Sequence, residues 1–197
     1  TSGGHIIVFD CSKPNTVTFK KVIAEHTGAV VDIAECEREK LCCSCDVSGN
    51  IVVWGKNLCS IEKKITTKLN YSCLSIYGRK VVVGTYTGKI LIFCADLGNL
   101  LIDINAHIRQ VNAVVVSNDC SKMLSVSEDS FLRVWHLNES AEKCTVECLH
   151  NERMENKSLV GVQFLDEAGT ALAVAAYDHS KLSFYEFSDA RKASVGL

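Results

Sequence analysis

One aromatic residue recurs along this chain at nearly constant spacing, each time at the end of the same short pattern. In five places a turn residue is followed by alternating β-forming residues, and the aromatic stands five positions after the turn residue. The segments are Gly4–Phe9, Gly49–Trp54, Gly88–Phe93, Ser130–Trp135 and Ser180–Tyr185. Successive aromatics are 45, 39, 42 and 50 residues apart. A repeat of this length, with period-two runs rich in Val and Ile, predicts a unit of several short strands rather than helices.

Further strand-like runs lie between the aromatics. After Trp54 these runs are Cys59–Thr66, Tyr71–Ile76 and Lys80–Gly84. After Phe93 they are Leu100–Ile104, Val111–Val116 and Lys122–Val126, and Phe131–Trp135 completes the set. Four strands per repeat, separated by turn residues, predict an all-β chain made of β-propeller blades.

The expected chain contains about four blades of a seven-bladed ring. Residues 1–23 are expected to hold the last two strands of one blade, and the full blades are 24–66, 67–104 and 105–149. The last blade, 150–197, is expected to lack its outer strand, and 138–158 to form a charged surface loop around a strand at Cys144–Leu149.

The seventeen expected strands are too few for a closed ring of about 28. Open blades expose apolar faces and unpaired strand edges. We therefore expect a missing N-terminal propeller half, or a second copy of the chain, to cover them.

Composition limits the classes of partner. The formal charge of −2 and the pI near 6.3 give no bulk attraction to nucleic acid. Apolar stretches such as Ala171–Tyr177 are far shorter than the roughly 20 residues that span a membrane. Most of the eleven cysteines lie in apolar, strand-like runs, as reduced structural thiols do. We therefore expect the partners to be neither nucleic acid nor membrane. We expect the chain itself to lie in the cytoplasm or the nucleus.

The run Met123–Trp135, with Ala106-His107 and Val111 upstream, resembles a WD40 repeat. That resemblance implies a buried structural tetrad of hydrogen-bonded side chains: His107, Ser125, Asp129 and Trp135. An earlier repeat matches in part, with His26, Ser44 and Trp54. There Ser48 stands at the aspartate position, and we expect Asp46, two residues away, to point elsewhere. The third blade has Phe93 for the tryptophan and no histidine.

The same resemblance implies that partners bind at the rim of the central channel. The corresponding positions lie three and five residues after the histidine and one before the aspartate. The candidates that follow are Tyr86, Arg109 (adjacent to such a position), Gln110, Asn112, Glu128 and Tyr177. A strict count in the last repeat gives Asp178 instead of Tyr177, and both alternatives stay open.

Motifs that suggest chemistry have simpler explanations here. His107, Asp129 and a serine could be read as a catalytic triad, but the repeat buries these positions, and a nucleophile needs exposure. Cys42-Cys43-Ser-Cys45 has no second ligand pair at the spacing that zinc prefers. Gly84–Lys89 is too short for a phosphate-binding loop.

We therefore expect no enzyme activity, no cofactor and no metal. The sequence favours a non-enzymatic scaffold or adaptor that binds proteins or peptides. The alternative is a reader of a modified peptide or nucleic acid at the channel face.

Overall fold

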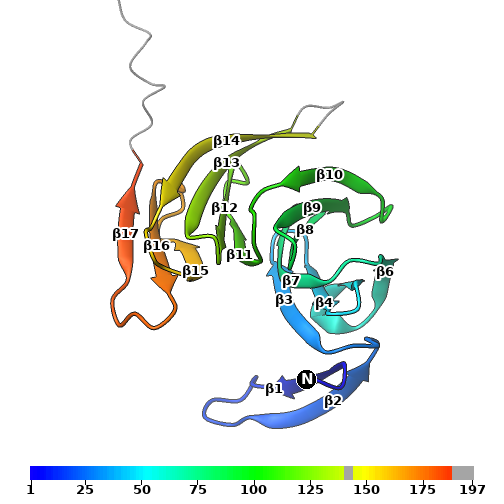
Figure 1. Ribbon diagram of the computed structural model, residues 1–197. Helices are drawn as coiled ribbons and strands as arrows, with labels where there is room; N and C mark the ends of the chain where they lie inside the picture. The colour runs from blue at the N-terminus through cyan, green and yellow to red at the C-terminus, as the bar shows by residue number, and fades with distance from the viewer. Residues whose placement is uncertain (140–143, 188–197) are drawn as a thin grey trace, which may run out of the picture. The chain divides into compact units, whose positions relative to one another are not determined.

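The computed structural model describes residues 1–139 and 144–187, and Figure 1 shows their strands. Apart from one short 3-10 helix, η1 (Lys56–Leu58), all regular elements in these ranges are strands. No helix in them is long and apolar enough to cross a membrane.

The strands form five antiparallel sheets in chain order, and three of them have four strands. The first four-stranded sheet contains β3 (Val30–Cys36), β4 (Leu41–Asp46), β5 (Asn50–Trp54) and β6 (Ile61–Thr66). The second contains β7 (Tyr71–Tyr77), β8 (Lys80–Thr85), β9 (Lys89–Cys94) and β10 (Leu100–Asn105). The third contains β11 (Val111–Val116), β12 (Lys122–Ser127), β13 (Phe131–Glu139) and β14 (Cys144–Arg153).

The two remaining sheets are smaller. One pairs β1 (His5–Asp10) with β2 (Thr18–Ala24). The other contains β15 (Leu159–Phe164), β16 (Ala171–Ala176) and β17 (Ser183–Glu186). The predicted all-β blade architecture is confirmed.

The turn residue of the repeat has a conformational role. Gly49 and Gly88 have φ values of +87° and +86°, and Ser130 has +70° at the same place. This left-handed region favours glycine, because other residues bring Cβ too close to the backbone. Each turn residue is followed at once by the third strand of its sheet, so it fixes where the aromatic of that strand falls.

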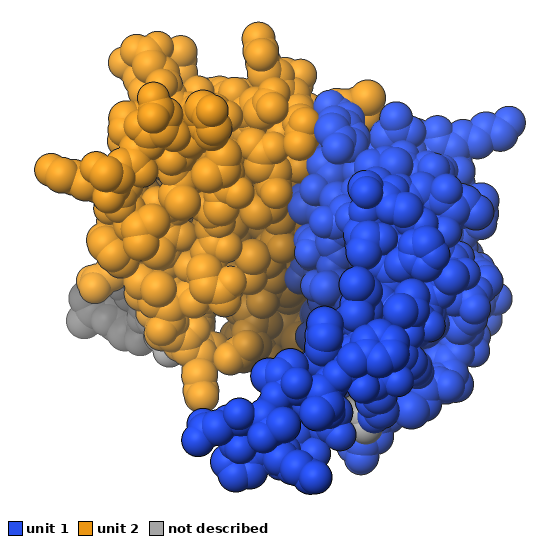
Figure 2. Space-filling view, turned by 90° about the horizontal axis from the view of Figure 1, so that it is seen from below, with its two compact units in different colours: residues 1–86, 90–104 blue, residues 87–89, 105–197 orange. Residues whose placement is uncertain are grey.

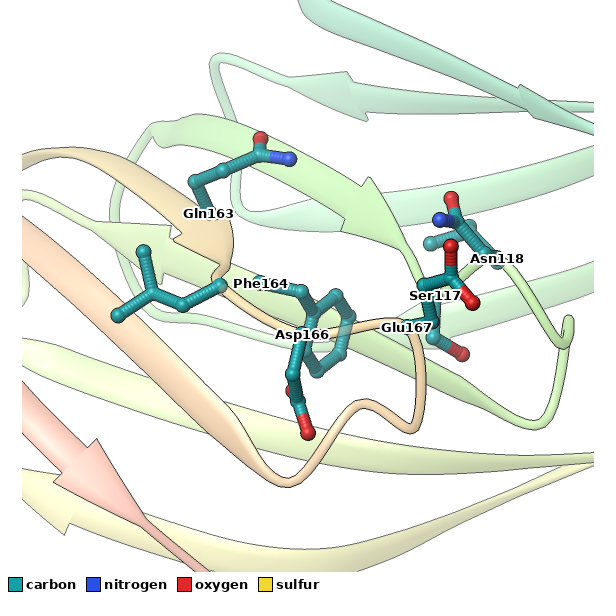
Figure 3. Close-up of a pocket in the computed structure, with 8 residues that line it drawn as sticks. Ser117, Asn118, Gln163, Phe164, Asp166 and Glu167 are labelled. Carbon is teal, nitrogen blue, oxygen red and sulfur yellow. The ribbon is translucent and has the colours of Figure 1, made fainter.

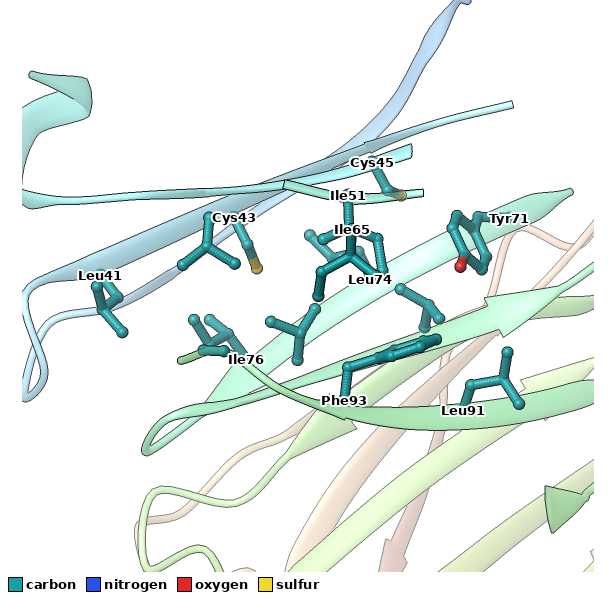
Figure 4. Packing of buried hydrophobic residues seen from close by; sticks show 14 residues of the cluster. Leu41, Cys43, Cys45, Ile51, Ile65, Tyr71, Leu74, Ile76, Leu91 and Phe93 are labelled. Atoms are coloured by element: carbon teal, nitrogen blue, oxygen red, sulfur yellow. The ribbon is translucent and has the colours of Figure 1, made fainter. Parts of the chain in front are cut away.

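The chain divides into two compact units, coloured in Figure 2. Unit 1 comprises Thr1–Tyr86 and Ile90–Ile104, and unit 2 comprises Thr87–Lys89 and Asn105 onward. Each unit has its own apolar core. The core of unit 1 joins side chains of the β3–β6 and β7–β10 sheets (Figure 4), and includes the fully buried Cys43 and Cys45. Alternation along each strand sends these residues to one face, which supplies the main stabilisation.

The expected strand at Cys144–Leu149 is present, but the charged loop expected around it in 138–158 is wrong in extent, because β13 reaches Glu139 and β14 reaches Arg153. β13 and β14 form a long hairpin whose pairing runs from Phe131 opposite Arg153 to Glu139 opposite Cys144. The amide of Met154 closes it with a 2.8 Å hydrogen bond to the Ser130 carbonyl. The strand therefore continues four residues past the expected boundary at 149. An outer strand is solvated, so charged residues along it do not indicate a loop.

Two smaller differences concern strand ends. The strand expected at Cys59–Thr66 begins at Ile61, because η1 ends at Leu58 with Cys59 as its C-cap in helical conformation. The expected last blade reaches residue 197, and its segment 188–197 lies outside the described residues.

Candidate functional site

Four side chains of unit 2 form a continuous buried hydrogen-bond chain. Trp135 Nε1 donates to Ser125 Oγ at 2.9 Å, and His107 Nε2 lies 2.8 Å from the same oxygen. His107 Nδ1 lies 3.0 Å from Asp129 Oδ2. Since the carboxylate can only accept, Nδ1–H donates to Asp129, and Nε2 of the neutral ring accepts from the serine hydroxyl, whose oxygen accepts from the indole N–H. The network joins the loop before β11, strand β12, the turn after it and strand β13 into a single array.

Burial lowers the pKa of His107 to about 4, although the neighbouring Asp129 carboxylate opposes that shift. The nearby Arg133 guanidinium lowers the pKa further. Arg133 Nη1 also donates to the Ala106 carbonyl. His107 is therefore neutral near pH 7, in the protonation state that the hydrogen-bond chain requires.

In the β3–β6 sheet, Asp46 is the aspartate of the hydrogen-bond network, although the repeat pattern has Ser48 at the aspartate position. The expectation that Asp46 points elsewhere is wrong, because its Oδ2 lies 3.2 Å from His26 Nδ1. His26 Nε2 lies 2.6 Å from Ser44 Oγ. The same oxygen accepts a hydrogen bond from Trp54 Nε1 at 2.9 Å. The chain of bonds is thus the same as in unit 2, with the aspartate two residues earlier. Ser44 and Asp46 are two residues apart on β4, so their side chains lie on the same face of the strand and both reach the histidine.

Asp46 is the most heavily bonded carboxylate of this region. Its oxygens accept hydrogen bonds from six donors: His26 Nδ1, Thr27 N, Gly28 N, Ser48 N, Asn50 N and Asn50 Nδ2. Burial raises the pKa of Asp46, but the bonds from Asn50, His26 and Gly28 outweigh it and hold that pKa below its ordinary value. The side chain of Asn50, which sequence reasoning missed, also donates to Thr27 Oγ at 2.9 Å.

In the β7–β10 sheet a threonine and a tyrosine lie where the other two sheets have the histidine network. Thr67 stands four residues before the first strand, where His26 and His107 stand in the other two sheets. Its hydroxyl lies 2.8 Å from the phenol oxygen of the fully buried Tyr71. Burial raises the pKa of Tyr71 to about 12, so the phenol stays protonated and keeps its hydrogen bond.

A repeated backbone bond defines the candidate rim. At one end of the four sheets that begin with β3, β7, β11 and β15, the residue after the second strand donates its amide to a carbonyl just before the first strand. The pairs are Val47 to Ala29 (3.0 Å), Tyr86 to Asn70 (3.3 Å), Glu128 to Gln110 (3.2 Å) and Tyr177 to Ser158 (2.8 Å). Tyr177, rather than Asp178, therefore occupies the equivalent position in the last sheet.

The first strand of each of these sheets carries an irregularity beside this bond. The pairing register shifts at the second residue of the strand: Val31, Ser72, Asn112 and Val160. Such bulges redirect side chains. Asn112 Nδ2 donates to the Leu159 carbonyl at 2.6 Å, so this candidate links two sheets of unit 2. One donor of this amide is therefore already engaged within the fold.

The other candidates differ in exposure. Tyr177 is 73% exposed and Tyr86 46% exposed. Arg109 and Glu128 are also exposed, whereas Gln110 is half-buried. The structure brings Arg109, Gln110 and Glu128 to one end of the β11–β14 sheet, whereas Tyr86 belongs to unit 1.

A cavity of about 160 Å³ lies at the opposite end of the unit 2 sheets, in the loops after β11 and β15 (Figure 3). Ser117, Asn118, Gln163 and Glu167 contribute to its lining. Asp166 is also in the lining, and its carboxylate accepts hydrogen bonds from the amide and the hydroxyl of Thr170. The cavity contains none of the rim candidates.

All eleven cysteines are reduced thiols that take part in no disulfide. Burial raises the pKa of Cys42 to about 11 and that of Cys45 above its usual range, so these thiols are protonated near pH 7. In the part of the chain that the structure describes, no three His, Cys, Asp or Glu side chains lie close enough to hold a metal ion.

Comparison with solved structures supports the fold. The computationally designed protein Ika4 matches 83% of this chain and 94% of its own length, with a TM-score of 0.68 at 18% identity. The designed protein Ika8 matches 88% of this chain and 50% of its own, with a TM-score of 0.69 at 17% identity. At such identities the likeness concerns the fold alone.

Comparison of sequences gives the family. WD repeat-containing protein 54 of Homo sapiens is 27% identical over 192 residues, which cover 92% of this chain and 58% of the human protein. WD repeat domain 54 of Rattus norvegicus is 28% identical over 193 residues, with the same coverage. The chain thus spans 58% of the length of these relatives. The family model of WDR54 matches residues 1–188. With its WD40-type blades and this match over nearly its whole length, the chain belongs to the WDR54 family.

Proposed function

We propose that this chain is a non-enzymatic scaffold that binds proteins or peptides at the rim defined by the repeated backbone bond. The observation that carries the proposal is the rim of unit 2, where exposed Arg109, Glu128 and Tyr177 stand on hydrogen-bonded backbone. Rigid scaffolds commonly bind through loops of this kind. Membership of a WD-repeat family supports the same role.

Tyr177 is the side chain with the best properties for binding at this rim. A tyrosine supplies a large apolar surface and a hydroxyl at a small entropic cost. Leu165 provides a matched control, because it is 54% exposed and follows β15 at the other end of the same sheet.

Affinity purification from cell extract tests the proposal. With Tyr177→Ala, proteins recovered by the wild type should fall about tenfold or more, since a buried tyrosine anchor contributes at least that much. Tyr86→Ala tests the equivalent position of unit 1, and Leu165→Ala should leave recovery unchanged. Equal losses for Tyr177→Ala and Leu165→Ala would contradict rim binding. Recovery abolished by nuclease would favour the nucleic-acid reader instead.

The two smaller sheets suggest a second kind of partner. Phe9 holds the place in β1 that Trp54 holds in β5, yet β1 pairs only with β2 in the described chain. Large apolar side chains of this hairpin are exposed, namely Ile7, Phe9, Phe19 and Val22. We propose that further blades, from an N-terminal propeller half or a second copy, cover them. Light scattering after size-exclusion chromatography should show association of the isolated chain, and a stable, soluble monomer would contradict this proposal.

The absence of disulfides among the eleven cysteines supports a reducing compartment, the cytoplasm or the nucleus, as the location of the chain. Mass spectrometry after thiol alkylation of protein taken from cells checks this. Disulfide-linked peptides would contradict it.

A further inference from the structure

Resting on the proposed rim function, we propose that Ile108 and Arg109 form a further anchor of the unit 2 rim, in addition to Tyr177. The partner inferred is a peptide segment in which a large apolar side chain stands close to a carboxylate. The apolar side chain packs on Ile108, and the carboxylate pairs with the Arg109 guanidinium. Ile108 was not among the positions implied by the repeat.

Ile108 has an unusual environment for an apolar residue. At 84% it is the most exposed large hydrophobic side chain in the described ranges. It lies at a bend in the loop between β10 and β11, directly after the buried His107. Single exposed apolar residues are common on protein surfaces, so exposure alone assigns nothing. Two further properties distinguish this one.

The first property is a fixed backbone. Each of the five loop residues 106–110 makes a hydrogen bond through its main chain. Three of these residues donate their amides: Ala106 and His107 to the Gly88 carbonyl (3.1 and 2.8 Å), and Ile108 to Asp129 Oδ2 (3.1 Å). The other two accept through their carbonyls: Arg109 from Ser127 Oγ (3.3 Å) and Gln110 from the Glu128 amide (3.2 Å). A loop held in this way loses little conformational entropy when a partner binds, which favours affinity. The buried His107–Asp129 pair thus supports the presentation of Ile108.

The second property is an uncompensated charge. The side chain of Arg109 makes no hydrogen bond or ion pair with residues 1–139 or 144–187. Leu97, which is 72% exposed, provides the contrast. Its neighbour Asp96 is already bonded by Arg79 Nε at 2.7 Å. An exposed apolar side chain beside an unpaired cation is complementary to an apolar residue beside a carboxylate.

Glu128 argues against a polyanion at this place. It is exposed at the same end of the same sheet, and its amide bonds to the Gln110 carbonyl. A phosphate backbone would approach this carboxylate unfavourably, and the second arginine near this loop, Arg133, already donates to the Ala106 carbonyl. A peptide can place one carboxylate at Arg109 and avoid a second near Glu128.

Selection from a phage-displayed library of random linear peptides tests the inference. The chain is immobilised, and enriched peptides are made synthetically and titrated by fluorescence anisotropy. We expect enriched sequences to share a carboxylate within a few residues of a large apolar side chain. Ile108→Ser should weaken their binding about tenfold or more. Leu97→Ser, the matched control, should bind as the wild type does. A new selection against Arg109→Glu should replace the acidic residue by a basic one.

Three outcomes would overturn the inference: no enriched peptide, equal binding to Ile108→Ser and wild type, or a charge preference that Arg109→Glu leaves unchanged. Peptides that lose binding with Tyr177→Ala but not with Ile108→Ser would overturn it and leave the proposed rim function standing. Peptides indifferent to all three rim variants would contradict both. Circular dichroism melting of each variant verifies that these exposed substitutions leave the fold intact.

Discussion

Replacing Gly88 by alanine is expected to destabilise the chain by about 3 kcal/mol or more, through backbone strain and overpacking. Gly88 has φ of +86°, and a Cβ at this position would lie 2.0 Å from the carbonyl oxygen of His107. That carbonyl belongs to the loop that presents Ile108 and Arg109, and the Gly88 carbonyl itself accepts the amides of Ala106 and His107. Neither backbone can move without breaking these bonds.

Gly78 provides the control for this prediction. Its φ of +49° is also left-handed, but a Cβ there would meet nothing within 4 Å. Gly78→Ala should therefore lose only about 1 kcal/mol, from the conformational preference alone. Urea denaturation of both variants measures the difference. Equal stability losses would show that the close approach at Gly88 has no energetic consequence.

Replacing Asp46 by alanine is expected to destabilise the chain by about 3–5 kcal/mol, because it removes the acceptor of one buried and five partly buried hydrogen bonds at once. Six hydrogen bonds end on its two oxygens, and its side chain is fully buried. The loss should appear as a lower midpoint of urea unfolding with an unchanged slope.

Ser48 is the informative control, since it occupies the position at which the repeat places the aspartate. It is exposed. Ser48→Ala should therefore change stability by no more than about 0.5 kcal/mol. If Ser48→Ala proved as destabilising as Asp46→Ala, the role assigned to Asp46 would be wrong.

Much of the architecture could be predicted because strand period, turn residues and repeat length are local properties of the chain. The turn residues Gly49 and Gly88 place the third strands where the spacing predicts them. The role of Asp46 could not be predicted by counting from the aromatic, because the relevant distance lies across the sheet, between β4 and the loop before β3. The alternation of Ser44 and Asp46 on one strand face was the signal that could have revealed it.

The rim was harder to derive than the strands. The choice between Tyr177 and Asp178 depends on the conformation of one turn, and only the bond to the Ser158 carbonyl decides it. Asn112 matched the position expected of a binding residue, yet its amide is used by the neighbouring sheet. Sequence spacing identifies which residues reach the rim. It does not say which of their polar groups are already engaged within the fold.

Hydrogen–deuterium exchange tests the central claim, that the rim is the binding surface, most directly. Exchange is measured by mass spectrometry for the chain alone and with a saturating peptide obtained from the selection. We predict that protection increases in residues 106–110, around Glu128 and around Tyr177, and that the outer strand β14 exchanges as before. Protection confined to β14 or to the loops around Asp166, with no change at the rim, would contradict the account.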